Sequence, residues 1–229
     1  LDAGPAIRYA TSARLLQAIV ERQREPAATK LLSVTAPQFA SDGERSRFAS
    51  LAGAAREGDA VINAVAKRLP SASIESLRGE QAREPAVRTA LPKAQWVHIA
   101  THGFVDQHHG ESFAGLALTP PLKSTAVQSS DDGLLQLFEL YDLPLHADLV
   151  VLSACSTGEG DAVAGEGVLA LSRAFVASGA RRVIATQWTV DDDSTAALVA
   201  GLFDSLASAE LKGQSLDVAH AQTLASHGL

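Results

Sequence analysis

Two residues in this sequence have the types and surroundings that nucleophilic catalysis requires. Cys155, the single cysteine among 229 residues, follows the apolar run Leu149–Leu152 and precedes small polar residues. His102 follows a second, largely apolar run at 96–100 and stands directly before Gly103. A thiol becomes an effective nucleophile when a neighbouring base or cation favours its thiolate. A Cys–His pair of this kind would transfer an acyl group onto the thiol and then hydrolyse the thioester.

The backbone amides of Gly103 and Cys155 are candidates for the two donors of an oxyanion hole. Gly103 lets the backbone turn sharply, so that its N–H can face a substrate carbonyl. One such donor contributes about 2.7–4 kcal/mol to transition-state stabilisation. A lone cysteine after an apolar strand is also commonly just a small buried residue. Spacing by itself therefore leaves a structural role for Cys155 open.

Both candidates end predicted strands of one sheet. Unbroken apolar runs such as Leu149–Leu152 are typical of parallel strands covered on both faces. Strands are expected at 7–9, 31–34, 73–77, 96–100, 112–118, 133–137, 149–152 and 182–188, and helices at 12–24, 54–69, 84–91, 138–141, 165–178, 191–206 and 216–226. Their alternation predicts an α/β fold with an open, mostly parallel sheet and helices on both faces. Such sheets carry ligands and catalytic groups at the carboxyl ends of their strands, where His102 and Cys155 fall.

The amino-acid composition indicates which kinds of binding partner and which cellular compartment to expect. Apolar residues make up 46% of the chain and charged residues 20%, which is enough for a sizeable core. The net charge of −7 and the lack of a basic segment argue against nucleic acid as a partner. A single cysteine excludes an internal disulfide framework and fits a reducing compartment, so we expect a cytoplasmic protein. We expect no membrane span and no secretory signal, because no apolar run approaches about 20 residues.

The remaining histidines and glycines suggest other chemistries that the spacing disfavours. His98 and His102 are four residues apart, which suits metal binding on a helix, but the local pattern is that of a strand. His108 and His109 fit a solvated loop better than a metal site, so we expect neither a metal nor a cofactor. We interpret His98 as a satisfied core histidine or as support for His102. The glycine-rich segment 158–167 lacks the spacing of a phosphate loop and is interpreted as a flexible active-site loop.

Two segments of the sequence resemble motifs of a known protein family. Residues 97–103, Val-His-Ile-Ala-Thr-His-Gly, and 151–158, Val-Leu-Ser-Ala-Cys-Ser-Thr-Gly, resemble the CHAT domain family. The segments 51–69, 165–167, 179–181 and 187–192 are similar to it as well. Members are caspase-like cysteine peptidases of the clan that includes separase, often fused to tetratricopeptide repeats. The resemblance implies a caspase-like fold, a single CHAT domain over 1–229 trimmed at both ends from a larger protein, and a helix over 51–69 with an acidic residue in its first turn.

The resemblance also implies roles for individual residues. His102 would be the general base and Cys155 the nucleophile, with Gly103 and Cys155 supplying the oxyanion hole. Relatives often cleave after a basic residue held by acidic side chains, and Asp191 and Asp192 match that S1 position. The same two aspartates would equally suit the N-terminal cap and dipole of a helix.

The expected function is therefore that of a cysteine endopeptidase that cleaves partner proteins or peptides after a basic residue. Its activity would depend on an activator, either a tetratricopeptide-repeat region of the same parent chain or a separate protein. The alternative is a catalytically silent CHAT pseudopeptidase that acts as an interaction and signalling module. The family often has Glu directly after the cysteine, where this chain has Ser156.

Overall fold

The centre of the molecule is a five-stranded parallel sheet. The computed structural model describes residues 17, 29–39, 48–104, 114–121, 131–154, 161–186 and 192–211, with the backbone alone for 161–166, 192–194 and 211. The sheet has the strand order β2-β1-β3-β7-β8. Its strands are β1 (Lys30–Pro37), β2 (Ser73–Gly79), β3 (Trp96–Ala100), β7 (Leu149–Ser153) and β8 (Val183–Ala185). The predicted parallel α/β sheet is confirmed.

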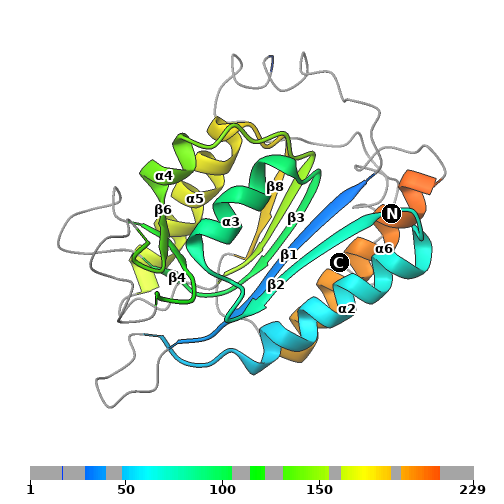
Figure 1. Cartoon of the computed structure of the whole chain (residues 1–229), viewed down its shortest axis with the longest axis horizontal. Helices are drawn as coiled ribbons and strands as arrows, with labels where there is room; N and C mark the ends of the chain where they lie inside the picture. Colours follow the sequence, from blue (N-terminus) through cyan, green and yellow to red (C-terminus); the bar gives the residue numbers. More distant parts are fainter. Residues whose placement is uncertain are drawn as a thin grey trace.

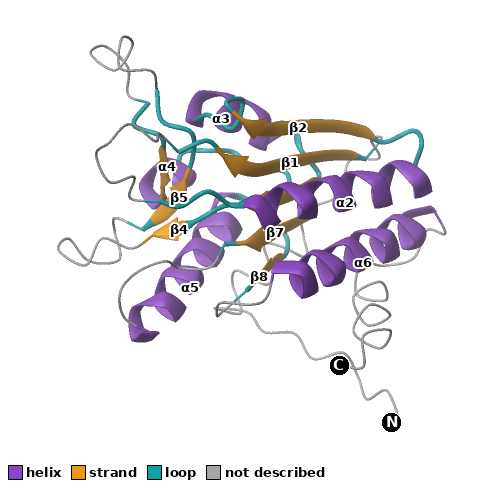
Figure 2. Ribbon diagram, turned by 90° about the horizontal axis from the view of Figure 1, so that it is seen from below, coloured by secondary structure: helices purple, strands orange, loops and turns teal. Residues whose placement is uncertain are grey.

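Helices cover both faces of this sheet (Figure 1). One face is covered by α2 (Ala52–Arg68) and α6 (Asp192–Leu211), which run side by side (Figure 2). The other face is covered by α3 (Glu84–Ala90), the 3-10 turn η1 (Leu91–Lys93), α4 (Leu137–Tyr141) and α5 (Asp161–Ser178). The expectation of helices on both faces is therefore confirmed. None of the described helices is long and apolar enough to cross a bilayer.

Alternate residues of each central strand enter two different cores. In β1, Leu31 packs with α2 and α6, whereas Leu32 packs with the layer of α3, α4 and α5. In β7, Val151 and Val150 divide in the same way. This alternation follows from the two-residue period of a strand and explains why the central strands read as continuous apolar runs.

A second, antiparallel sheet continues from the carboxyl end of β3. It is formed by β4 (Gly103–Phe104), β5 (Gly115–Ala117) and β6 (Leu134–Gln136). Strands near β5 and β6 were expected, but β4 was not, because two residues give no periodic signal. This small sheet fixes the direction in which the chain leaves His102.

Some local predictions are corrected. The helix α5 begins at Asp161 rather than Gly165, so 161–167 is helix and not the expected loop. Strand β8 is shorter than 182–188 and only half-buried. The first turn of α2 holds no acidic residue; its buried carboxylate, Glu57, comes a turn later. The strand predicted at 7–9 and the helix at 216–226 lie outside the described residues, as does the helix at 12–24 except for Gln17.

Candidate active site

His102 lies just beyond the carboxyl end of β3, where the chain passes into β4. Two hydrogen bonds fix this link to Ala117 of β5. The hydroxyl of Thr101 donates to the carbonyl oxygen of Ala117 at 2.6 Å, and the N–H of Ala117 donates to the carbonyl oxygen of His102 at 2.8 Å. The small sheet therefore holds the backbone of the candidate base at the edge where the sequence predicted it.

The imidazole of His102 is 6% exposed, and one of its nitrogens is committed to the backbone. Its Nε2 lies 2.9 Å from the carbonyl oxygen of Ala49. A carbonyl oxygen can only accept, so Nε2 carries a proton and donates it. The proton that His102 gains and loses is then the one on Nδ1. A general base needs this arrangement, in which one nitrogen stays protonated and the other is free to act.

Two phenylalanine rings pack against this imidazole. Phe48 stacks on it with a centroid distance of 5.5 Å and an interplanar angle of 22°, and Phe39 lies at 5.6 Å in a tilted geometry. Phe48 also meets Phe104 of β4 at 6.2 Å. The two phenylalanine rings also contact each other at 5.4 Å, and this aromatic cluster restricts rotation of the imidazole. The side chain is therefore fixed in orientation as well as in protonation.

Cys155 lies outside the described residues, but the strand that leads to it is described. Ala100 of β3 pairs with Ser153 of β7 in the parallel register. His102 and Cys155 each follow two residues after this pair. A Cβ placed on Gly103 would lie 3.8 Å from the carbonyl oxygen of Ala154, so the two chain segments are in contact just before the cysteine.

The amide of Gly103 is turned away from the small sheet. Because the N–H of Ala117 bonds the carbonyl of His102, Gly103 and Leu116 form a pair of the non-hydrogen-bonded type. The N–H of a residue in such a pair points away from the partner strand. Gly103 does not adopt a left-handed backbone, so the sharp turn expected of it is not what requires glycine here.

The side chains of the two predicted S1 residues, Asp191 and Asp192, are not described. Asp191 lies outside the described residues. Asp192 is the first residue of α6, and only its backbone is described. Two hydroxyl oxygens at the same end of the sheet, those of Ser153 and Thr186, are buried and have no hydrogen-bond partner among the described residues. No sequence signal marks these hydroxyls, nor the Phe39, Phe48 and Ala49 contacts of His102.

His98 is the satisfied core histidine that the strand pattern suggested. Its Nε2 lies 2.7 Å from Oε1 of Glu57, and its Nδ1 lies 3.1 Å from the hydroxyl oxygen of Ser33. His98 and Ser33 are wholly buried and Glu57 is 4% exposed. Among the described residues, no group of three His, Cys, Asp or Glu side chains could hold a metal ion.

A carboxylate pair lies between α3 and α4. Arg88 contacts Glu139 at 2.6 Å and Glu84 at 3.3 Å. Burial, the charge of Glu139 and a hydrogen bond with it raise the pKa of Glu84 from 4.5 to about 7, although the N–H of Asp132 opposes this. The pair joins α3 to α4, and neither carboxylate is among the described contacts of His102.

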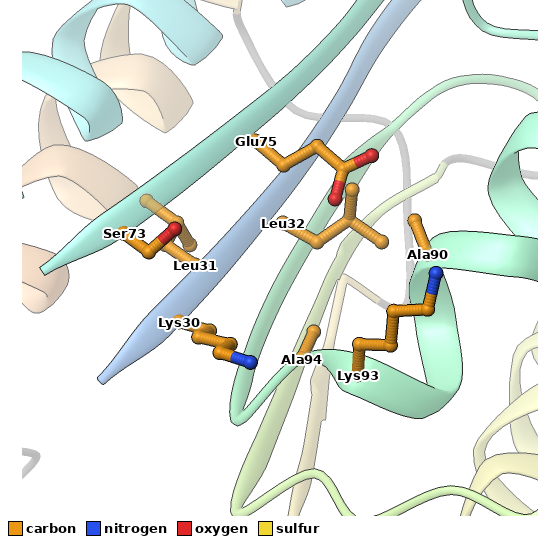
Figure 3. Close-up of a pocket in the computed structure, with 8 residues that line it drawn as sticks. All are labelled: Lys30, Leu31, Leu32, Ser73, Glu75, Ala90, Lys93 and Ala94. Carbon is orange, nitrogen blue, oxygen red and sulfur yellow. The ribbon is translucent and has the colours of Figure 1, made fainter. Parts of the chain in front are cut away.

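A small hollow lies at the opposite end of the sheet, where strands begin (Figure 3). Figure 3 shows Lys30, Lys93, Glu75 and Ser73 around it, together with Leu31, Leu32, Ala90 and Ala94. Lys30 opens β1 and Ser73 opens β2. Because parallel strands place their catalytic groups at the carboxyl ends, this hollow is not part of the candidate site.

The fold and the site define a class of protein. A mostly parallel α/β sheet, covered on both faces and ending in a fixed histidine beside the segment that follows β7, is a caspase-like architecture. The family model described as the CHAT domain matches residues 3–228, and the chain belongs to the CHAT domain family, whose general context is the caspase-like peptidase clan.

Curated relatives are much longer proteins. The chain is 29% identical to tetratricopeptide repeat protein 28 of Mus musculus and 28% identical to that of Homo sapiens. In each case the match covers 67% of this chain and 7% of the relative. The relatives are thus named for tetratricopeptide repeats, and the chain spans only a small part of their length.

Proposed function

We propose that this chain is a cysteine endopeptidase domain in which His102 is the general base and Cys155 the nucleophile. The observation that carries the proposal is the bond from Nε2–H of His102 to the Ala49 carbonyl. It leaves Nδ1 as the nitrogen that exchanges a proton. The matched register of β3 and β7 supports it, since each residue follows two positions after the pair Ala100 and Ser153.

In the proposed reaction, Nδ1 of His102 takes the thiol proton of Cys155, and the thiolate attacks the scissile carbonyl. The N–H groups of Gly103 and Cys155 donate to the oxyanion that forms. Collapse breaks the C–N bond, and the imidazolium gives its proton to the leaving amine. Water, deprotonated by His102, then hydrolyses the thioester and regenerates the thiol. The Gly103 amide is suited to this role because it points away from β5.

Specificity is proposed to come from Asp191 and Asp192, which would attract a basic P1 side chain. Asp192 is the first residue of α6, the helix that follows β8 in the sequence. We further propose that 1–229 works as one domain inside a longer parent protein. An activator, such as a tetratricopeptide-repeat region or a partner protein, is proposed by analogy with the repeat-bearing relatives.

The decisive test combines peptide hydrolysis with alkylation of the single cysteine. Peptides with Arg, Lys, Asp or Leu at P1 would be compared for the wild type, Cys155→Ala and His102→Gln. Both variants should lose at least 10²-fold in kcat/KM, as expected when a nucleophile or its base is removed. His146→Gln, which changes an exposed histidine, is the matched control and should be unaffected.

Alkylation measures the reactivity of the Cys155 thiol, and it can do so even when no activator is present. In the wild type, iodoacetamide should react with Cys155 at a lower pH than with a free thiol, and His102→Gln should remove this difference. Hydrolysis that survives Cys155→Ala rules the proposal out. An ordinary alkylation profile in the folded wild type favours the silent interaction module instead. Asp191→Asn with Asp192→Asn should abolish any preference for Arg, whereas Asp193→Asn should not.

A further inference from the structure

The contact between Ala49 and His102 depends on where helix α2 lies on the sheet. Ala49 precedes the first helical residue, Ala52, by three positions. Its carbonyl oxygen reaches His102 from outside the sheet, so any sliding or lifting of α2 would move that oxygen away from Nε2. The question is which interactions fix α2 near its N-terminal end.

A polar anchor near that end is the network of Glu57, His98 and Ser33. Glu57 lies in the second turn of α2, His98 in β3 and Ser33 in β1. With Glu57 as a carboxylate, the N–H at Nε2 of His98 donates to it at 2.7 Å, and the hydroxyl of Ser33 lies 3.1 Å from Nδ1. The three residues join the helix to two adjacent strands of the sheet, which pair at Ser33 and His98.

Burial makes this network specific in its geometry. A buried carboxylate is tolerated only when its charge is matched by well-placed donors. Sliding α2 by one residue, about 1.5 Å along its axis, would break the contact between Glu57 and Nε2 of His98, while Ser33 would stay at Nδ1. Phe203 of α6 lies edge-on to the His98 ring, with a centroid distance of 5.8 Å.

Close packing at the next residue, Gly58, sets the distance between α2 and the sheet. A Cβ on Gly58 would lie 2.7 Å from Cγ2, 2.9 Å from Oγ1 and 3.2 Å from Cβ of Thr35 in β1. Because Thr35 Cβ itself is that near, rotating the threonine side chain cannot make room. Glycine therefore lets α2 approach the sheet closely enough for Glu57 to reach His98.

We propose that Glu57 and His98 are positioning residues, which hold α2 so that the Ala49 carbonyl keeps Nε2 of His102 protonated and Nδ1 available. The inference rests on the proposed role of His102 as general base, but its structural part can be tested without catalysis. A residue that only stabilises the fold would leave the His102 ring unchanged in a folded variant. A positioning residue, when replaced, should change which ring nitrogen of His102 carries the proton.

The test records the ring nitrogen resonances of His102 in the full chain labelled with ¹⁵N-histidine, at a pH where the ring is neutral. His102→Gln identifies its signals among the 7 histidines. The wild type should show one protonated nitrogen, Nε2, and one unprotonated nitrogen. Glu57→Gln keeps an acceptor oxygen and should preserve this pattern. Glu57→Leu removes the acceptor and should move both signals toward a mixture of the two tautomers.

The same variants are compared for alkylation of Cys155 near neutral pH. Glu57→Leu should slow it by roughly three- to tenfold, the range expected from the loss of one orienting hydrogen bond. Val65→Ala, which removes buried volume from the same helix, is the control for lost stability. It should lower the melting temperature without changing the His102 signals. A folded Glu57→Leu protein with unchanged signals overturns the proposal.

A second pair of variants covers the case in which Glu57→Leu does not fold. Gly58→Ala should disturb the His102 signals by lifting α2, and adding Thr35→Gly should restore them, because it removes all three Thr35 atoms that the new methyl group would meet. Unchanged signals in folded Gly58→Ala would again refute the proposal. If Cys155 in the wild type alkylates like a free thiol, the proposed dyad fails, yet the nitrogen resonances still decide whether α2 positions the ring.

Discussion

At the scale of residues, the geometry of His102 separates its two ring nitrogens. Imidazole is a directional base only when one nitrogen is fixed as a donor, and the Ala49 carbonyl does this at 2.9 Å. The stacked ring of Phe48 then limits rotation about the side chain. The adjacent Gly103 presents its amide away from β5, so the base and the proposed oxyanion donor are consecutive residues.

Gly103→Ala should separate a structural requirement from a catalytic one. A Cβ at this position would meet only ordinary contacts, 3.8 Å from Ala154 O and from Leu171 Cδ1, and the backbone is not left-handed. We expect a change in unfolding free energy below about 1 kcal/mol. If the Gly103 amide faces a substrate carbonyl, the added methyl group obstructs that approach, and kcat/KM should fall by about tenfold or more.

Thermal unfolding and peptide hydrolysis on the same preparation check this prediction. Gly58→Ala is the matched comparison, because its Cβ would lie 2.7 Å from Thr35 and should cost about 1–3 kcal/mol of stability. A Gly103→Ala protein that is fully active would remove Gly103 from the oxyanion hole. One that is strongly destabilised would show that glycine is needed there for the fold.

Residue types in the sequence pointed to His102, Cys155 and Gly103, but not to what holds the histidine. The contact to Ala49 uses a backbone carbonyl, which every residue has, so no residue type marks it. The sequence did suggest that His98 supports the site. Its partner Glu57 lies 41 positions away, and only the packing of α2 on β3 brings the two together.

At the scale of elements, α3 and α4 are joined by carboxyl groups whose charge opposes their contact. Glu84 is 2% exposed and Glu139 is 9% exposed, and the single cation that the described contacts show between them is Arg88. The pKa of Glu84 is raised to about 7, so its protonated form fits the folded structure better than its ionised form.

This predicts a pH-dependent stability with a definite sign. In the unfolded chain Glu84 titrates near 4.5, and in the folded protein near 7. Between these values the folded state binds more protons, so the free energy of unfolding falls as pH rises from 4.5 to 7 and then levels off. We expect Glu84 to account for roughly 1–2 kcal/mol of this fall in the free energy of unfolding. This is less than the full pKa shift would give, because Arg88 and solvent screen the ionised pair.

Urea unfolding at a series of pH values measures the effect. Glu84→Gln cannot ionise, so it should lose this part of the slope and be more stable than the wild type above pH 7. Glu75→Gln, at an exposed position of β2, is the control and should keep the wild-type slope. Equal slopes for Glu84→Gln and the wild type would place the pKa of Glu84 near its ordinary value.

Element boundaries show which sequence signals were strong. Long periodic helices and the apolar strands 96–100 and 149–152 were predicted to within a few residues, because their patterns report burial directly. The two-residue β4 and the early start of α5 at Asp161 were not, since the first is too short for periodicity and the second begins in a glycine-rich segment. The small antiparallel sheet depends on pairings that are not local in sequence.

At the scale of the whole molecule, the two cores share the same strands and should not unfold separately. Leu31 and Leu32 are neighbours in β1 but belong to opposite cores. Loss of either helix layer would expose one apolar face of the sheet to water, at about 25 cal/mol for each Å² of apolar surface. The α/β class was predictable from the alternation of elements, whereas the assignment of each helix to a face was not.

We therefore predict a single cooperative transition for the chain in urea. Trp96 is fully buried in the α2 and α6 core and meets Phe203 at 6.3 Å, so its fluorescence reports on that layer. In a Trp188→Phe variant, in which Trp96 is the sole tryptophan, the fluorescence transition should coincide with the loss of helical circular dichroism. An earlier fluorescence transition would mean that the α2 layer detaches from a sheet that stays folded. Because Ala49 belongs to that layer, His102 would then lose its carbonyl partner before the protein unfolds, and the activity of the proposed dyad should disappear at the lower urea concentration.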